Sequence, residues 1–176
     1  MRIFVDVLVY IVIYMVIVTV HEFGHYVVAR LQGVPAANAR VRLLSMPPHV
    51  ALKMDEQWIS PIAGSAYASA IVQWMKPGRQ IFQFCAAGLV GQTLVVAPVG
   101  LALWAGGLSV WAFVATVMSA AMLVFYIVFD PIMSAFVGHA AGDIGGMWSQ
   151  ARIVTVFTLS ALVLGHAGLA ALYLLN

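Results

Sequence analysis

Charged side chains are scarce in this chain: only 8% of its 176 residues are Asp, Glu, Lys or Arg, whereas 64% are hydrophobic. A water-soluble domain is typically about 45–50% apolar and about 25% charged, so this composition excludes that class. The mean hydropathy of +1.02 indicates an integral membrane protein. Because the net charge is only +2 and no block of Lys and Arg is present, we expect no nucleic-acid partner.

Cysteine, internal repeats and signal cleavage sites are also scarce or missing from the sequence. The single cysteine, Cys85, excludes an intramolecular disulfide, and its apolar neighbours predict a buried side chain rather than a reactive thiol. The first apolar run continues to Ala29 without an A-x-A cleavage site, so we expect this helix to stay in the mature protein. With no low-complexity linker, residues 1–176 are predicted to form a single membrane domain.

Four apolar segments are long enough to cross a hydrocarbon core of about 30 Å, which takes about 20 helical residues. They cover residues 4–29, 81–105, 109–137 and 152–175. A fifth apolar stretch, residues 58–75, is shorter and rich in small residues, so it either spans the membrane, re-enters it or lies at its interface. The predicted fold is therefore an all-α polytopic membrane protein.

The only polar region of any length, residues 33–57, follows the first predicted helix. It alternates polar and apolar residues in ARVRLLSM and PPHVALKMD around two prolines, which predicts a small β-hairpin. An exposed strand edge can bind an extended peptide, so this hairpin is either a substrate-binding edge or a plain surface element.

The motif HEFGH, residues 21–25, lies inside the first apolar segment and fits the pattern H-E-x-x-H. An ionisable side chain at the centre of a membrane helix costs about 2.5–3.5 kcal/mol, so such residues usually mark a functional site. Histidines at i and i+4 share one helix face, where His21 and His25 can bind one Zn²⁺. Glu22 lies beside them and can act as general base on a water molecule. The alternative is that these side chains only hydrogen-bond to other helices or pair with an arginine.

A catalytic zinc site needs a third protein ligand and keeps a fourth position for water. Asp6 lies at the wrong end of the first helix to supply that ligand. We expect His49, which follows Pro48 in a turn, to face solvent. His166 lies within the last apolar segment, and we expect it to pack between helices.

Asp130, His139 and Asp143 remain as candidates for the third ligand. Glycines surround the last two of these residues, and they are Gly138, Gly142, Gly145 and Gly146. Backbone so rich in glycine predicts an irregular loop that enters the membrane, which is tolerated only where protein or water covers it.

A spanning helix with HEFGH resembles the intramembrane metalloproteases of the site-2 protease family, and a second segment strengthens the resemblance. This segment is residues 75–98, MKPGRQIFQFCAAGLVGQTLVVAP. It is similar to the family's basic residues that precede a helix with an AGPxxN-type start. Gly88 stands at the glycine of this pattern, while Leu89 and Gln92 stand where proline and asparagine are usual.

A third segment, FDPIMSAFVGHAAGDIGGMW (residues 129–148), resembles the family's NxxP and LDGG-type region. Asp130 stands at the asparagine and Asp143 at the aspartate, over a longer spacing than usual. The resemblance covers roughly residues 4–150, and no PDZ-like domain is inserted.

The resemblance implies a zinc metalloendopeptidase that hydrolyses membrane-embedded or juxtamembrane peptide bonds, as in regulated intramembrane proteolysis. It implies a Zn²⁺ ion bound by His21, His25 and Asp143. Glu22 would be the general base. We expect Asp130 and Gln92 to contact either the metal ligands or the substrate backbone. The expected partners are a transmembrane protein substrate, the lipid bilayer and a separate regulatory or adaptor protein in place of a PDZ domain.

Six of the eight Lys and Arg residues lie between the first two predicted spans, and the positive-inside rule places this connection in the cytoplasm. HEFGH then lies near the cytoplasmic face of a multi-pass protein, expected in the cell membrane. Asp143 lies near this same face only if residues 58–75 do not cross the membrane. Two other functions stay open: a metal-binding membrane transporter, which needs a polar path across the bilayer, and a catalytically inactive relative that binds membrane segments.

Overall fold

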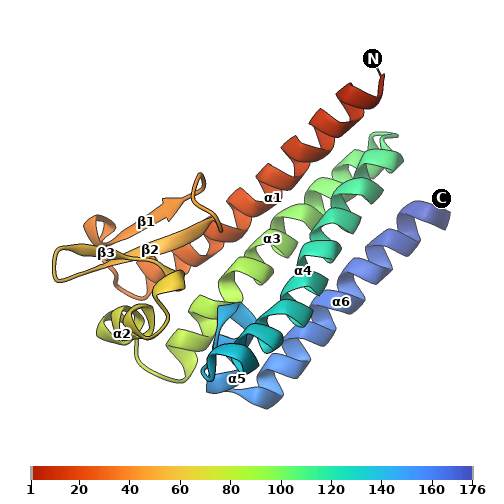
Figure 1. The fold of residues 1–176 in the computed structure, drawn as a ribbon. Coiled ribbons are helices and arrows are strands. Elements are labelled where there is room, and N and C mark those ends of the chain that lie inside the picture. The colour runs from red at the N-terminus through yellow and green to blue at the C-terminus, as the bar shows by residue number, and fades with distance from the viewer. Residues whose placement is uncertain (1, 176) are drawn as a thin grey trace.

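Four long helices lie side by side in the computed structural model, which describes residues 2–175 (Figure 1). They are α1 (Arg2–Leu31), α3 (Arg79–Ala105), α4 (Ser109–Val137) and α6 (Arg152–Leu175). Within the described residues, these four helices are long and apolar enough to cross a membrane. Their bounds lie within two residues of the predicted spans, which confirms the multi-pass architecture. The start of α1 and the end of α6 lie at the same end of the bundle, as an even number of crossings requires (Figure 1).

A small antiparallel sheet lies at the other end of the bundle, beside the end of α1 (Figure 1). Its strands are β1 (Ala39–Arg42), β2 (His49–Met54) and β3 (Gln57–Ile59), in the order β1-β2-β3. The first two strands form the predicted hairpin, with Arg42 opposite His49.

The third strand was not predicted, and it follows from a two-residue turn between β2 and β3. Asp55 and Glu56 both have positive φ, at 46° and 64°. Two successive positive φ values are typical of the type I′ turn that joins tightly paired strands. The usual sequence signal for this turn is Asn-Gly or Asp-Gly, so the Asp-Glu pair here gave no indication of it.

Residues 58–75 do not form a spanning helix. After β3 they hold a 3₁₀ turn (Pro61–Ala63) and the ten-residue helix α2 (Ser65–Trp74). A helix of that length is about 15 Å long, about half of the hydrocarbon thickness. The segment therefore returns the chain to α3 at the same end of the bundle where α1 finished.

The predicted irregular loop around Asp143 is wrong in its secondary structure, because this region contains a short helix, α5 (Gly142–Gln150). The glycines that suggested a loop instead permit close packing of this helix. A Cβ on Gly146 would overlap the Cys85 sulfur on α3, so α5 lies directly against that helix. Cys85 is buried there, as predicted.

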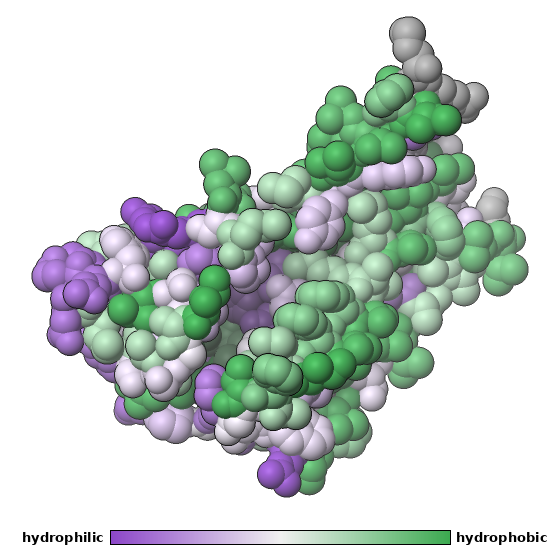
Figure 2. All heavy atoms as spheres, in the orientation of Figure 1, coloured by the Kyte–Doolittle hydropathy of each residue, from purple (hydrophilic) through white to green (hydrophobic). Residues whose placement is uncertain are grey.

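The centre of the bundle is formed by α3, which packs against α1 on one side and α4 on the other. A Cβ on Gly24 would overlap the carbonyl oxygen of Ala87, so the backbones of α1 and α3 approach closely at HEFGH. One apolar core joins this end of the bundle to the sheet and to α2, and it includes Ala29, Leu52 and Phe84. Figure 2 shows apolar atoms covering the long helices and hydrophilic atoms gathered over the sheet.

Candidate metal centre

Three side chains from two distant segments meet at one point in the bundle. The Nε2 atoms of His21 and His25 are 3.2 Å apart, and the Asp143 Oδ2 atom lies 3.1 Å from the first and 3.2 Å from the second. Both histidines are buried, while Asp143 is part-buried at the start of α5. These three residues are the group that the described part of the chain offers to a metal ion.

Hydrogen bonds on the far side of each imidazole fix which nitrogen faces this point. The His25 Nδ1–H donates to the Phe84 carbonyl oxygen at 2.7 Å, and a carbonyl can only accept. The His21 Nδ1 atom lies 3.1 Å from Oε1 of Gln92, which is also an acceptor. Both Nε2 atoms therefore present lone pairs toward each other and toward the Asp143 carboxylate. These three acceptors repel one another unless a cation lies between them or one Nε2 atom carries a proton.

The donor triangle has the size that a tetrahedral zinc site requires. Zinc bonds to nitrogen and oxygen are about 2.0–2.1 Å long, which places neighbouring ligand atoms about 3.3 Å apart. The three observed separations are 3.1–3.2 Å, so the residues present fit Zn²⁺. Imidazole and carboxylate are also the ligand types of catalytic zinc sites.

Gly88 on α3 leaves room for this centre. A Cβ at this position would overlap the Nε2 atoms of both His21 and His25. Any larger residue would therefore fill the space between the imidazoles that a metal ion requires. The sequence resemblance singled out Gly88, and this contact gives the physical reason for a glycine there.

Asp130 does not reach the histidine pair. Its Oδ2 atom instead accepts a 2.9 Å hydrogen bond from the backbone N–H of Ile144, in the first turn of α5. A Cβ on Gly142, which has a φ of +68°, would overlap the Asp130 carboxylate. Asp130 thus binds the free N–H groups at the start of α5 and holds the helix that carries Asp143.

The carboxyl of Asp143 is electrostatically suited to remain ionised in this site. Burial alone would raise its pKa, but the His25 and His21 imidazoles outweigh burial and hold the pKa below its ordinary value. An ionised carboxylate is the form that binds a metal ion.

Glu22 and His49 lie together beside the donor triangle. Glu22 is buried, and its carboxylate interacts electrostatically with His25, His21 and His49. The expectation that His49 faces solvent is wrong, because it is only 7% exposed. Its Nδ1–H donates to the Pro47 carbonyl oxygen at 2.9 Å, which fixes the ring at the start of β2. The sequence gave no sign that the sheet would pack over HEFGH.

The other predicted residues are placed as follows. His139 is exposed on the turn after α4 and does not belong to the donor triangle. Gln92 is fully buried, and its Oε1 atom lies 3.1 Å from the His21 Nδ1 atom. His166 packs between helices as predicted, with its Nε2 atom 2.9 Å from the Ser119 hydroxyl oxygen.

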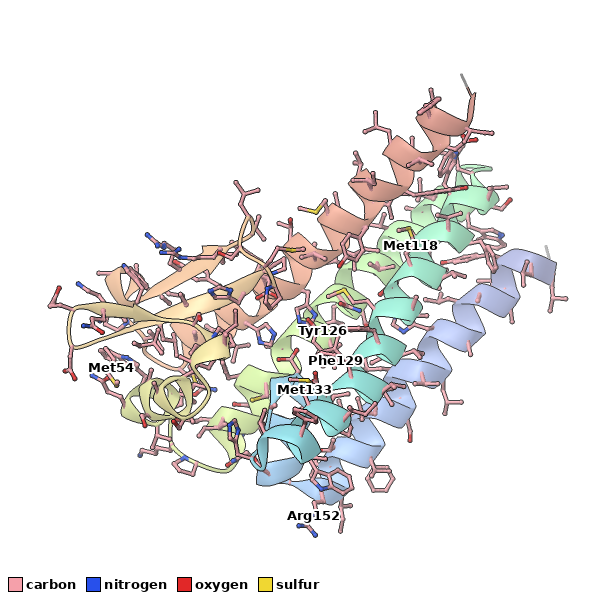
Figure 3. The ribbon with its side chains drawn as sticks, in the orientation of Figure 1. Met54, Met118, Tyr126, Phe129, Met133 and Arg152 are labelled. Atoms are coloured by element: carbon pink, nitrogen blue, oxygen red, sulfur yellow. The ribbon has the colours of Figure 1, made fainter. Side chains whose placement is uncertain are left out.

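Tyr126 is a residue of this centre that the sequence did not indicate. Its ring stacks on His21 with the centroids 5.0 Å apart and the planes inclined by 14°. Figure 3 shows Tyr126 on α4 between Met118 and Phe129. One aromatic residue among the many of an apolar helix carries no signal of its own, so only the fold reveals this contact.

Comparisons with family models, curated proteins and solved structures find no match for this chain. The resemblance to site-2 proteases therefore stays a prediction from the sequence. What the structure adds is the meeting of His21, His25 and Asp143 across 118 residues of chain.

Proposed function

We propose that this protein is an intramembrane zinc metalloendopeptidase of the site-2 protease type. The observation that carries the proposal is the triangle of His21, His25 and Asp143 donor atoms with the Glu22 carboxylate beside it. Two lone pairs and a carboxylate oxygen within 3.2 Å form a site for a cation, and a buried acid next to it serves no evident packing purpose. The HEFGH sequence assigns roles to His21, His25 and Glu22, with Asp143 as the added ligand.

In this proposal His21, His25 and Asp143 hold Zn²⁺, which supplies Lewis acidity toward the scissile carbonyl. Glu22 takes a proton from the attacking water, whose oxygen forms a bond to the carbonyl carbon. The C–N bond then breaks, and Glu22 passes the proton to the leaving amine. The products are one new carboxylate and one new amine, so the step needs only water as co-reactant.

His49 and Tyr126 would support this chemistry without binding the metal. His49 interacts electrostatically with the Glu22 side chain and can help to hold it beside the donor triangle. Tyr126 covers one face of His21 and limits the positions that this imidazole can adopt.

An apolar groove between α1 and α4 supports a transmembrane substrate. A cavity of about 320 Å³ is lined by Tyr14, Met118, Ala121, Met122 and Phe125. Tyr14 lies two turns before His21 on the same face of α1, and Phe125 is the neighbour of Tyr126 on α4. We propose that an apolar substrate segment enters from the bilayer along this groove and approaches the donor triangle.

The sheet provides a way to hold that substrate once it unwinds. A peptide bond in a helix has its backbone groups hydrogen-bonded, so the substrate has to become extended before hydrolysis. Strands β1 and β3 are the edges of the sheet, and either edge can pair with an extended peptide. Figure 2 shows a hollow between the sheet and the helices with hydrophilic atoms in its depth.

The charge distribution favours a site near the cytoplasmic face of the membrane. Six of the eight Lys and Arg residues lie in the connection between α1 and α3 or at the helix ends beside it, and this connection includes the sheet at the HEFGH end of the bundle. By the positive-inside rule this end is cytoplasmic, which gives water a short path to the site. We propose the cell membrane as the location and a separate adaptor protein for regulation.

Metal content and cleavage together test the proposal. The protein is purified in detergent and its zinc content is compared with that of a His21→Ala, His25→Ala variant. Both are then reconstituted in phosphatidylcholine vesicles with a set of quenched fluorogenic single-span peptides. We expect about one zinc per natural chain, little in the variant, and cleavage only by the natural chain. Zinc binding without cleavage of any peptide would favour a transporter or an inactive relative instead.

A further inference from the structure

A continuous chain of hydrogen bonds runs from His21 through the bundle to α6. The Gln92 amide on α3 links the His21 Nδ1 atom to Ser119 on α4, and the Ser119 hydroxyl continues to the His166 Nε2 atom on α6. Heavy-atom separations along this path are 3.1, 3.2 and 2.9 Å. All four side chains are buried, with exposures between 0 and 3%.

The far end of the path fixes the direction of every hydrogen bond. The His166 Nδ1 atom lies 2.8 Å from the Leu162 carbonyl oxygen, so this nitrogen carries a proton. In the neutral ring the Nε2 atom then accepts, and the Ser119 hydroxyl has to donate to it. Because that hydrogen is used, the Ser119 oxygen is left to accept from Gln92.

Ser119 therefore offers Gln92 two acceptors and no donor. The Gln92 Nε2 group lies 3.2 Å from both the Ser119 hydroxyl oxygen and the Ser119 backbone carbonyl oxygen. An amide flipped by 180° would direct its own oxygen at these acceptors and its NH₂ group at His21. Since the Gln92 side chain is fully buried, the flipped orientation would leave these groups without their protein partners.

We propose that Ser119 and His166 are positioning residues that fix the Gln92 amide and thereby hold His21 in the Nδ1–H form, with its Nε2 atom free for a metal ion. The inference rests on the proposed function only for the identity of that ion. The donor and acceptor of each hydrogen bond along this path are the same in the metal-free protein. A buried histidine 145 positions away from His21 in the sequence thus acts on the metal ligand through two intervening side chains.

The tautomer of His21 can be observed directly in the metal-free protein. Protein labelled with ¹⁵N-histidine is measured in micelles, where protonated and unprotonated ring nitrogens have well-separated shifts. The His21 signals are assigned by their loss in a His21→Gln variant. We expect Nδ1–H His21 in the natural chain and a mixture of tautomers in a His166→Leu variant. An unchanged His21 spectrum in that variant overturns the proposal.

Zinc affinity, measured by competition with a chelating dye, gives the second readout. Loss of groups that orient a metal ligand typically lowers affinity by about 10–100-fold. We expect such a loss for His166→Leu and for Ser119→Ala, with partial recovery in His166→Gln, whose amide oxygen can accept from Ser119. Thr155→Val is the matched control, since Thr155 is a buried polar residue of α6 whose hydroxyl donates to the carbonyl oxygen of Ala151, the residue just before this helix, and not to the Gln92 path.

A double-mutant cycle separates this role from simple packing of α6. In a Gln92→Met background the amide is absent, so His166→Leu should change zinc affinity by less than about 2-fold. An equal loss in both backgrounds would show that His166 acts through the fold alone, and the proposal would fail. If His166→Leu does not fold, Ser119→Ala is measured in the same two backgrounds with the same criterion.

Failure of this positioning role can be distinguished from failure of the proposed peptidase function. A natural chain that binds zinc but cleaves no peptide overturns the peptidase and leaves these affinity ratios interpretable. A natural chain that binds no zinc overturns the metal centre, while the ¹⁵N spectrum still decides whether Ser119 and His166 set the His21 tautomer.

Discussion

The Asp130 carboxylate accepts a hydrogen bond from the backbone N–H of Ile144, the residue that follows Asp143. This single contact separates the roles of two aspartates that lie 13 residues apart in the sequence. Asp130 secures the start of α5 from α4, and α5 in turn presents Asp143 to the histidine pair. The donor triangle therefore depends on Asp130 without including it.

The two aspartates should respond differently to substitution. Asp143→Asn should leave the purified protein nearly metal-free, because a lost ligand costs more than the 10–100-fold typical of groups that only orient ligands. Asp130→Asn should keep zinc, since an amide oxygen can still accept from Ile144. Asp130→Ala removes this cap and should cost about 0.5–2 kcal/mol of stability and part of the zinc affinity. The reverse pattern in metal analysis would make Asp130 the ligand.

Glu22→Gln should separate metal binding from catalysis. The amide is nearly isosteric with the acid but cannot accept a proton from water, so zinc content should stay at the natural level. Peptide cleavage in vesicles should fall by at least the ~10²–10⁴-fold attributed to general base catalysis. Substantial residual cleavage at full zinc loading would remove Glu22 from its assigned role.

The spans and the HEFGH site were predictable because each rests on local sequence. A run of about 20 apolar residues can only be satisfied in lipid, and i, i+4 spacing places His21 beside His25 whatever the rest of the chain does. Elimination left Asp143 as one of three candidates for the third ligand, and the resemblance then favoured it over Asp130 and His139. Its position depends on Asp130 and on close packing of Gly146 against Cys85, and both are contacts between segments.

Residues that contact the site from other helices or from the sheet could not be predicted from the sequence, because their roles also depend on contacts between distant segments. His49 looked like a turn residue, because nothing in PPHVALKMD indicates that the sheet folds back over Glu22. Ser119 and Tyr126 are single residues of an apolar helix with no periodic or motif signal. Their roles depend on which face of α4 meets α3 and α1, which the uniformly hydrophobic sequence of that helix does not specify.

Labelling with a membrane-impermeant maleimide should find the segments before and after α2 on one side of the membrane. Cysteines replacing the exposed residues Gln57 and Lys76 should react from the same face as a cysteine at Arg40, and one at Leu108 from the opposite face. The native Cys85 is buried and should stay unlabelled in the folded protein. Reaction of positions 57 and 76 from opposite sides would mean that α2 crosses, in conflict with its ten residues.

Filling the groove between α1 and α4 should impair cleavage without affecting the metal. Met122→Trp places a larger ring in the cavity of about 320 Å³ and should raise the KM for single-span peptides several-fold, at unchanged zinc content. Leu164→Trp is the matched control, because Leu164 is 71% exposed on α6. Equal effects of the two substitutions would indicate that the substrate does not use this groove.

Gly88→Ala should abolish zinc binding by adding a single methyl group. Alanine is the better helix former, so α3 itself should not be weakened. The new Cβ would nevertheless overlap the Nε2 atoms of His21 and His25, so the imidazoles would have to separate. We expect zinc affinity to fall by more than about 100-fold, as for a lost ligand, and cleavage to fall with it.

Gly168→Ala provides the control for this substitution, because a Cβ at that position of α6 meets no atom within 4 Å. Its zinc content and cleavage should equal those of the natural chain. Circular dichroism of both variants should show natural helix content, so that loss of metal in Gly88→Ala reflects the site alone. Full zinc loading in Gly88→Ala would mean that the metal, if bound, does not lie between the two Nε2 atoms, and the donor triangle would not be the metal site.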